Sequence, residues 1–276
     1  MSTRICTDLS PSALANAVKF NLYEFFRYLG RAKQTEFLDE GGLMRWYTRV
    51  PHPWFNGVLG SRPATADDRQ GIQETIAFFK ARSVTSFTWW FAPTLTRADW
   101  EGDLLSHGLR HDDHTPGMAV DLTRLNTSVN TPPGFTIATV ADTDALRAWA
   151  HIITTSYDLP ASSEKQLREL MIGLGLDGPI RNYLGYLDGK PVATSQLFVA
   201  AGVGGIMFVA TLPEARGQGI GAAITLAPLL EARHMGYRIG ILQSSDMGFR
   251  IYRRLGFEVV CRMEHFSWME GARSEA

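Results

Sequence analysis

The chain has 276 residues, of which 45% are hydrophobic and 20% are charged, a composition typical of globular proteins. Its 27 lysines and arginines nearly balance 28 aspartates and glutamates, which excludes the basic excess expected of a nucleic-acid-binding protein. The two cysteines exclude a disulfide framework, and no apolar run approaches the roughly 20 residues that span a bilayer. We therefore expect a cytoplasmic protein that binds neither nucleic acid nor membranes.

The first half of the chain alternates strand-like and helix-like patterns. The expected strands cover residues 43–50, 55–60, 84–93 and 117–122. The expected helices cover residues 65–83 and 96–109.

The second half repeats this order of elements in a longer form. The expected strands cover residues 134–142, 182–187, 191–200, 205–212, 237–244 and 257–268. The expected helices cover residues 142–157, 162–174, 219–235 and 247–255. Asp188-Gly189 is a strong signal for a hairpin turn between two of the strands.

Between the halves lies a polar stretch without periodicity that contains Pro132-Pro133-Gly134. It predicts a linker over residues 126–133, between a domain at 1–125 and a domain at 134–276. The shared order strand, strand, helix, strand, helix, strand favours a duplicated α/β unit with a mixed sheet.

The stretch Arg216-Gly217-Gln218-Gly219-Ile220-Gly221 stands between an expected strand and an expected helix. Backbone N–H groups without a neighbouring Cβ, set at the positive end of a helix, are suited to bind an anion. Arg216 adds a charge that reaches phosphate oxygens. A tight turn without any ligand is the alternative, and the spacing does not fit the GxGxxG loop of dinucleotide-binding folds.

These residues fit the pattern Arg/Gln-x-x-Gly-x-Gly/Ala and resemble the acyl-CoA pyrophosphate loop of the GNAT superfamily of N-acetyltransferases. Downstream, SSDMGFRIYRRLGFE at residues 244–258 resembles the second signature of that family, a short helix with a Tyr and a closing Leu-Gly-Phe. The resemblance covers residues 134–268. Because the first half has SRPATADDRQG instead of a glycine loop, it resembles a degenerate copy. The resemblance implies two GNAT-like acyl-CoA N-acyltransferase domains in tandem.

The resemblance also implies roles for residues around the loop. The main-chain groups of Val209 and Thr211 are expected to bond the pantetheine arm, and the Val209 N–H to stabilise the oxyanion. Tyr252 takes the family's position for the general acid, although a buried core aromatic is its alternative. Ser245 replaces the Asn of many relatives, so a cofactor contact and a helix N-cap both stay open. The expected cofactor-binding residues are Val209, Thr211, Arg216, Gly217, Gln218, Gly219, Ile220, Gly221, Ala222, Ser245, Gly248 and Tyr252.

The general base stays open, because the expected strand over residues 205–212 lacks the Glu that many relatives carry there. Among the side-chain alternatives only His265 has an ordinary pKa near neutral. A water chain, or an amine that arrives deprotonated, would also serve. The side-chain alternatives are Tyr157, Asp158, Gln196, Glu214, Glu264 and His265.

The expected function is acetyl-CoA-dependent N-acetyl transfer to a primary amine of a small molecule or amino-acid-like acceptor, by direct attack in a ternary complex. The alternative is an acyl-CoA-binding sensor or assembly module without turnover. No metal site is expected, because the run His111-Asp112-Asp113-His114 is interpreted as a solvated turn. The expected partner is the amine substrate, with a homodimer as a further alternative.

Overall fold

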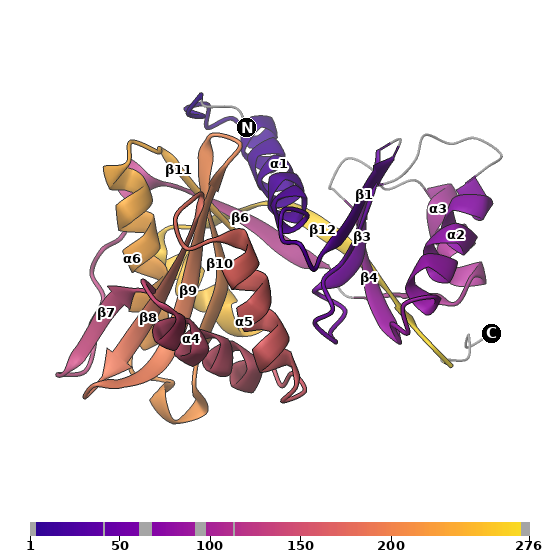
Figure 1. The fold of residues 1–276 in the computed structure, drawn as a ribbon. Coiled ribbons are helices and arrows are strands. Elements are labelled where there is room, and N and C mark those ends of the chain that lie inside the picture. The colour runs from indigo at the N-terminus through magenta and orange to yellow at the C-terminus, as the bar shows by residue number, and fades with distance from the viewer. Residues whose placement is uncertain (1–3, 41, 61–67, 92–97, 113, 272–276) are drawn as a thin grey trace. The chain divides into compact units, whose positions relative to one another are not determined.

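The computed structural model describes residues 4–40, 42–60, 68–91, 98–112 and 114–271 (Figure 1). The chain forms two compact units, each made of two segments. The first unit contains residues 1–25 and 116–261, and the second contains residues 26–115 and 262–276.

The first unit is built on a mixed sheet. Its strands are antiparallel except for one parallel pair, β10 with β11. Asp188 and Gly189 have φ values of 49° and 77° and form the predicted hairpin turn between β8 and β9. The strand order is β6 (Thr115–Asp121), β11 (Ile239–Gln243), β10 (Val203–Thr211), β9 (Lys190–Ala200), β8 (Ile180–Leu187) and β7 (Phe135–Thr139).

Helices cover both faces of this sheet (Figure 1). Because side chains alternate along a strand, Ser195 of β9 meets the backbone of α6 (Ile220–His234), whereas Gln196 meets Met171 of α5 (Ser163–Leu174). On the α6 face also lies α7 (Asp246–Leu255), and on the α5 face lies α4 (Thr143–Ser156).

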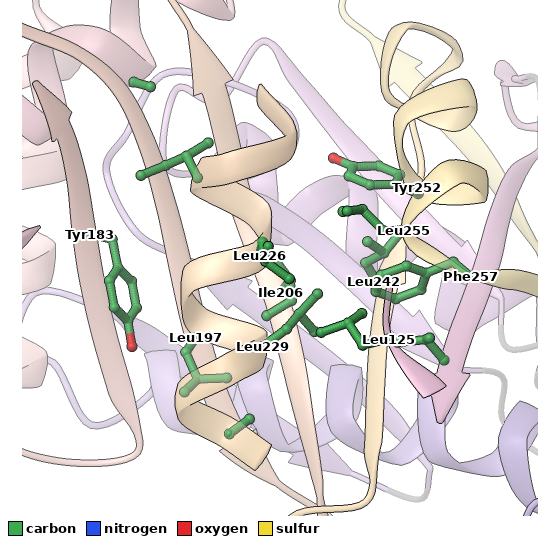
Figure 2. Close-up of a cluster of buried hydrophobic side chains, with 14 of the residues drawn as sticks. Leu125, Tyr183, Leu197, Ile206, Leu226, Leu229, Leu242, Tyr252, Leu255 and Phe257 are labelled. Atoms are coloured by element: carbon green, nitrogen blue, oxygen red, sulfur yellow. The ribbon is translucent and has the colours of Figure 1, made fainter. Parts of the chain in front are cut away.

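A buried hydrophobic cluster joins the sheet to α6 and α7 (Figure 2). Strands β9, β10 and β11 contribute aliphatic side chains to it, and the two helices supply their partners. Its members include Leu197, Ile206, Leu226, Leu229, Leu242, Tyr252, Leu255 and Phe257. This cluster fixes the glycine stretch, which begins α6, to the strands before and after it.

The second unit has its own sheet and core. Its sheet carries α2 (Asp68–Lys80) and α3 (Ala98–Ser106), which bury Ile72, Phe79 and Leu104 against strand residues such as Phe87 and Trp89. The strands are, in order, β1 (Glu36–Glu40), β2 (Leu43–Tyr47), β3 (Asn56–Gly60), β4 (Ser86–Phe91) and β12 (Glu258–Met269), with β5 (Leu109–His111) also paired to β12.

The two halves of the chain exchange their last strands. β6, from the first half, pairs with β11 in the first unit, whereas residues 264–269 of β12, from the second half, pair with β4 in the second unit. The units therefore do not follow the expected bounds of 1–125, 126–133 and 134–276, because each sheet is completed by a strand from the other half. The expected linker lies within the first unit, where the Asn126 N–H donates to the Leu255 carbonyl at 3.1 Å.

The elements expected in the second half are confirmed, each within a few residues of its bounds. The helix expected at 65–83 is described from Asp68, and residues 65–67 lie outside the described residues. Among the α-helices and strands of the described residues, three were not predicted: α1 (Pro11–Leu29), β1 and β5. The signal for α1 was present, because Val18, Leu22 and Phe25 follow helical spacing and are buried. In the described part of the chain, no helix has the length and apolar character that crossing a bilayer requires.

Candidate active site

β10 separates from its parallel neighbour before it reaches the glycine stretch. Among the described residues, its pairing with β11 covers 204–206, whereas its pairing with β9 continues to Thr211. The Leu212 N–H bonds to the Val192 carbonyl on β9. Because peptide groups alternate in direction along a strand, those of Thr211 and Val209 face the opposite side, where β11 no longer pairs.

A β-bulge lies at the same place. The register between β10 and β9 shifts after Met207, so that Phe208 and Val209 together oppose Ser195. Phe208 has a φ of 49°, in the left-handed region that bulky residues seldom occupy. Surrounding contacts must therefore hold this conformation.

Two side-chain hydroxyl groups bond to the bulge. Thr194 Oγ1 donates to the Phe208 carbonyl at 2.9 Å, and the Tyr157 hydroxyl donates to the Val209 carbonyl at 3.0 Å. The Trp149 ring packs edge-on against the Phe208 ring, with centroids 5.4 Å apart. The Val209 carbonyl thus has a partner inside the protein, which leaves the N–H of Val209 as the group with which this residue can meet a ligand.

The glycine stretch forms the predicted turn into α6. Gly217 and Gly219 have φ values of 77° and 81°, and the helix begins at Ile220. The N–H groups of Ala222 and Ala223 bond to the Gly219 carbonyl. The N–H groups before them have no acceptor within the helix, and they stand at its positive end. This arrangement can hold a pyrophosphate.

Arg216 and Gly219 have additional contacts in this turn. The exposed Arg216 side chain donates through Nε to the Thr211 carbonyl at 3.0 Å, which holds the guanidinium beside the turn. Gly219 has a structural requirement of its own, because a Cβ there would collide with the backbone carbonyl of Asn130. Gly221 differs, since its φ is outside the left-handed region and a Cβ there would meet neighbours only at 3.4 Å or more.

Tyr252 lies on the buried side of α7 with 7% of its surface exposed. Its ring and its hydroxyl lie over Gly248 of the same helix, where an added Cβ would come within 2.6 Å of the ring and 3.0 Å of the hydroxyl oxygen; Figure 2 shows this side chain beside α7. Burial raises the pKa of Tyr252 to about 12. Burial, and then the nearby Tyr252, also raise the pKa of Tyr157 far above its usual value. Both hydroxyls therefore keep their protons at neutral pH.

Ser245 is the N-cap of α7. Its Oγ accepts a hydrogen bond from the Gly248 N–H at 3.3 Å, so the N-cap alternative for this residue is confirmed. Gly248 likewise has a structural reason to be glycine, since the Tyr252 ring lies against it.

The candidate bases in the first unit do not form one cluster. Glu214 and Asp158 are exposed. Gln196 is fully buried, and its Nε2 donates to Asn182 Oδ1 at 2.7 Å. Tyr157 uses its proton in the bond to Val209 and retains it because of its raised pKa.

The other two candidates, Glu264 and His265, belong to the second unit. Glu264 bonds to His111 at 2.7 Å. The His265 ring packs against Trp90, with centroids 4.2 Å apart, and burial lowers the pKa of His265 to about 4. Burial thus removes the near-neutral pKa that made His265 a candidate base, because the imidazolium would lose its hydration there. Within the described residues, no group of three or more His, Cys, Asp or Glu side chains is placed to hold a metal ion.

The role of Thr194 was not predicted from the sequence. A β-branched residue in a strand is typical of ordinary sheet packing, and only the register shift opposite it reveals the bond to Phe208. Tyr157 is one of the candidate bases, but its hydroxyl donates to the Val209 carbonyl.

Comparison with known proteins agrees with the strand separation at β10 and the glycine turn before α6. Residues 180–259, which include the glycine stretch and Tyr252, match the acetyltransferase (GNAT) domain family. Similar solved structures include a GCN5-related N-acetyltransferase from Kribbella flavida, with a TM-score of 0.67, 22% identity and coverage of 94% of this chain and 96% of that one. Another, from Sphaerobacter thermophilus, has a TM-score of 0.61, 18% identity and coverage of 96% and 94%.

A tandem GNAT protein from the clavulanic acid biosynthesis pathway is also similar, with a TM-score of 0.57, 16% identity and coverage of 87% of this chain and 84% of that one. No protein of curated function matches the sequence. Residues 180–259 thus match the GNAT domain family, and the fold of these solved N-acetyltransferase structures extends over nearly the whole chain, in agreement with two GNAT-like domains in tandem.

Proposed function

We propose that this protein is an acetyl-CoA-dependent N-acetyltransferase that acts on a primary amine of a small molecule or amino-acid-like acceptor. The observation that carries the proposal is the position of residues 216–221. They form the turn into α6, after β10 and the 3-10 turn Pro213–Ala215, and Val209 and Thr211 of β10 face the unpaired side. The N–H groups of residues 217–221, together with the Arg216 side chain, would hold the pyrophosphate. The Val209 N–H would then lie along the path of the pantetheine arm.

The proposed reaction is a direct displacement in a ternary complex. The amine nitrogen attacks the thioester carbonyl carbon, and the electrons of the C=O double bond move to oxygen, where the Val209 N–H donates a hydrogen bond. When the carbonyl re-forms, the C–S bond breaks and sulfur leaves as a thiolate. Tyr252 supplies a proton to that sulfur. The amine reacts in its neutral form, and as the amide forms its nitrogen releases one proton to water, while the Tyr252 phenolate regains a proton from water.

The raised pKa of Tyr252 is compatible with this role. A free thiol has a pKa of about 8.5, so a phenol at about 12 would be a weak donor to a thiolate in water. The burial that destabilises the phenolate also destabilises a thiolate beside it, however, and raises the affinity of the sulfur for a proton. The hydroxyl therefore remains protonated until an anion forms next to it.

The proposal is tested by calorimetric titration of acetyl-CoA into the wild-type protein, Gly221→Glu and Gly221→Gln. Gly221 can accept a side chain, and a carboxylate in the first turn of a helix favours the helix. We expect micromolar binding by the wild type and by Gly221→Gln. We expect at least about tenfold weaker binding by Gly221→Glu, because its carboxylate repels the pyrophosphate.

Equal binding by the two variants would mean that the pyrophosphate does not lie at the start of α6. Absence of binding by the wild type would reject acetyl-CoA as the donor. With binding established, a panel of primary amines separates an enzyme from a sensor that binds without turnover.

A further inference from the structure

We infer that Thr194 and Tyr157 are positioning residues that together aim the Val209 N–H at the thioester carbonyl. We call this pair the hydroxyl clamp. The inference rests on the proposed function, in which that N–H stabilises the oxyanion. It assigns a positioning task to two hydroxyl groups that donate to backbone carbonyls of the bulge.

Thr194 acts on the peptide unit that carries the donor. The carbonyl of Phe208 and the N–H of Val209 belong to the same planar trans peptide, so they point in opposite directions. Thr194 Oγ1 holds that carbonyl at 2.9 Å from the β9 side. The Val209 N–H is thereby turned away from β9, toward the side on which β11 has ceased to pair.

Tyr157 acts on the next peptide unit. Its hydroxyl donates to the Val209 carbonyl at 3.0 Å, from the C-cap position of α4. Since the N–H and the carbonyl of one strand residue face the same side, Tyr157 holds Val209 from the side that the thioester would approach. The two bonds thus fix both peptide planes that flank the Val209 Cα.

The bulge needs these two hydrogen bonds because its backbone conformation is unfavourable by itself. Phe208 occupies the left-handed region with a bulky side chain, a conformation that persists only where neighbouring groups hold it. Without the two hydroxyl bonds, this peptide could rotate toward a regular extended geometry, and the N–H would lose its direction. Thr194 is fully buried and Tyr157 is part-buried, so bulk water does not readily replace them.

The test is the carbonyl stretching frequency of bound acetyl-CoA labelled with ¹³C at the thioester carbonyl, measured by isotope-edited infrared spectroscopy. A hydrogen bond from the Val209 N–H lowers this frequency relative to free acetyl-CoA. We expect Thr194→Val and Tyr157→Phe each to reverse at least half of that lowering. The dissociation constant of acetyl-CoA should change less than about threefold, because pyrophosphate binding is independent of the clamp. Acetyl transfer should slow by roughly tenfold or more.

Matched control variants distinguish a change in the orientation of the Val209 N–H from a general loss of structure. Thr48→Val removes a buried hydroxyl that donates to the Phe55 carbonyl at 2.9 Å in the second unit. Tyr183→Phe removes a hydroxyl that donates to Glu231. Both should keep the wild-type frequency, as should Thr194→Ser, which retains the bonding oxygen. Circular dichroism verifies that each variant is folded.

If folded Thr194→Val and Tyr157→Phe both show the carbonyl stretching frequency of the wild-type complex, the inference about the hydroxyl clamp is wrong. An unshifted frequency in the wild-type complex would overturn it as well, although acetyl-CoA binding would stand. Failure of the wild type to bind acetyl-CoA is a distinct result, which removes the proposed function and the clamp together.

Discussion

The buried imidazole of His265 links folding of the second unit to pH. His265 packs against Trp90, and its Nε2 has no hydrogen-bond partner among the described residues. Burial lowers its pKa to about 4, Glu264 opposes this effect, and His111 and His114 reinforce it. The folded protein therefore holds His265 neutral across most of the pH range in which an unfolded histidine becomes charged.

The direction of the pH effect follows from the two pKa values. An unfolded histidine titrates near 6.5 and the folded one near 4, so between these values the unfolded chain binds more protons. Stability is unaffected above pH 6.5 and decreases as the pH falls toward 4. The difference between the two pKa values corresponds to about 3 kcal/mol of unfolding free energy in total. Between pH 7.5 and 4.5 we expect wild type to lose about 2 to 3 kcal/mol more than His265→Phe in urea unfolding.

The exposed His151 serves as the control for this prediction, since it pairs with Glu164 on the surface. His151→Phe should keep the wild-type dependence on pH. An equal loss of stability in wild type and His265→Phe would show that His265 is protonated in the folded protein.

At the scale of elements, α6 contains a proline that deprives one of its own carbonyls of a partner. Pro228 lies inside the helix and has no N–H to offer the Ile224 carbonyl. Ser195 of β9, fully buried, donates its hydroxyl to that carbonyl at 2.7 Å. A sheet residue thus replaces the missing helical bond, and it ties the helix that carries the glycine turn to the bulged strand pair.

Ser195→Ala should therefore destabilise the protein by about 1–3 kcal/mol, because it leaves a buried carbonyl unpaired. In a Pro228→Ala background, the new N–H can bond to Ile224, so Ser195→Ala should cost clearly less. A double-mutant cycle in urea unfolding measures this coupling. Additive effects of the two substitutions would mean that Ser195 contributes through packing alone.

Features that depend on neighbouring residues in the chain could be predicted from the sequence, whereas contacts between residues far apart in the chain could not. The turn at Asp188-Gly189 and the glycine turn before α6 depend on residues adjacent in the chain, and local patterns predict both of them. The bond from Tyr157 to Val209 and the bulge opposite Ser195 join residues far apart in sequence. Periodicity reports which residues share a face of one element, but not which strand lies next to another.

At the scale of the whole molecule, the first half supplies parts of the unit that contains the candidate site. β6 completes the sheet beside β11, and Asn21 of α1 donates to the carbonyls of Phe198 and Ala200 at 3.3 and 3.1 Å. In return, β12 completes the sheet of the second unit beside β4. The first half of the chain therefore contributes a strand and a helix to the unit that contains the candidate site.

The strand exchange predicts how fragments of the chain behave. A fragment of residues 134–276 lacks β6, so it exposes the hydrogen-bonding edge of β11, whose residues Ile239 and Ile241 are fully buried in the intact protein. A fragment of residues 116–276 retains β6 and covers that edge. We expect the shorter fragment to aggregate or to melt at least about 10 °C lower, as judged by light scattering and circular dichroism. Adding residues 1–29 as a peptide should stabilise the longer fragment further. A shorter fragment that stays monomeric and melts with the longer one would show that the second half needs no strand from the first.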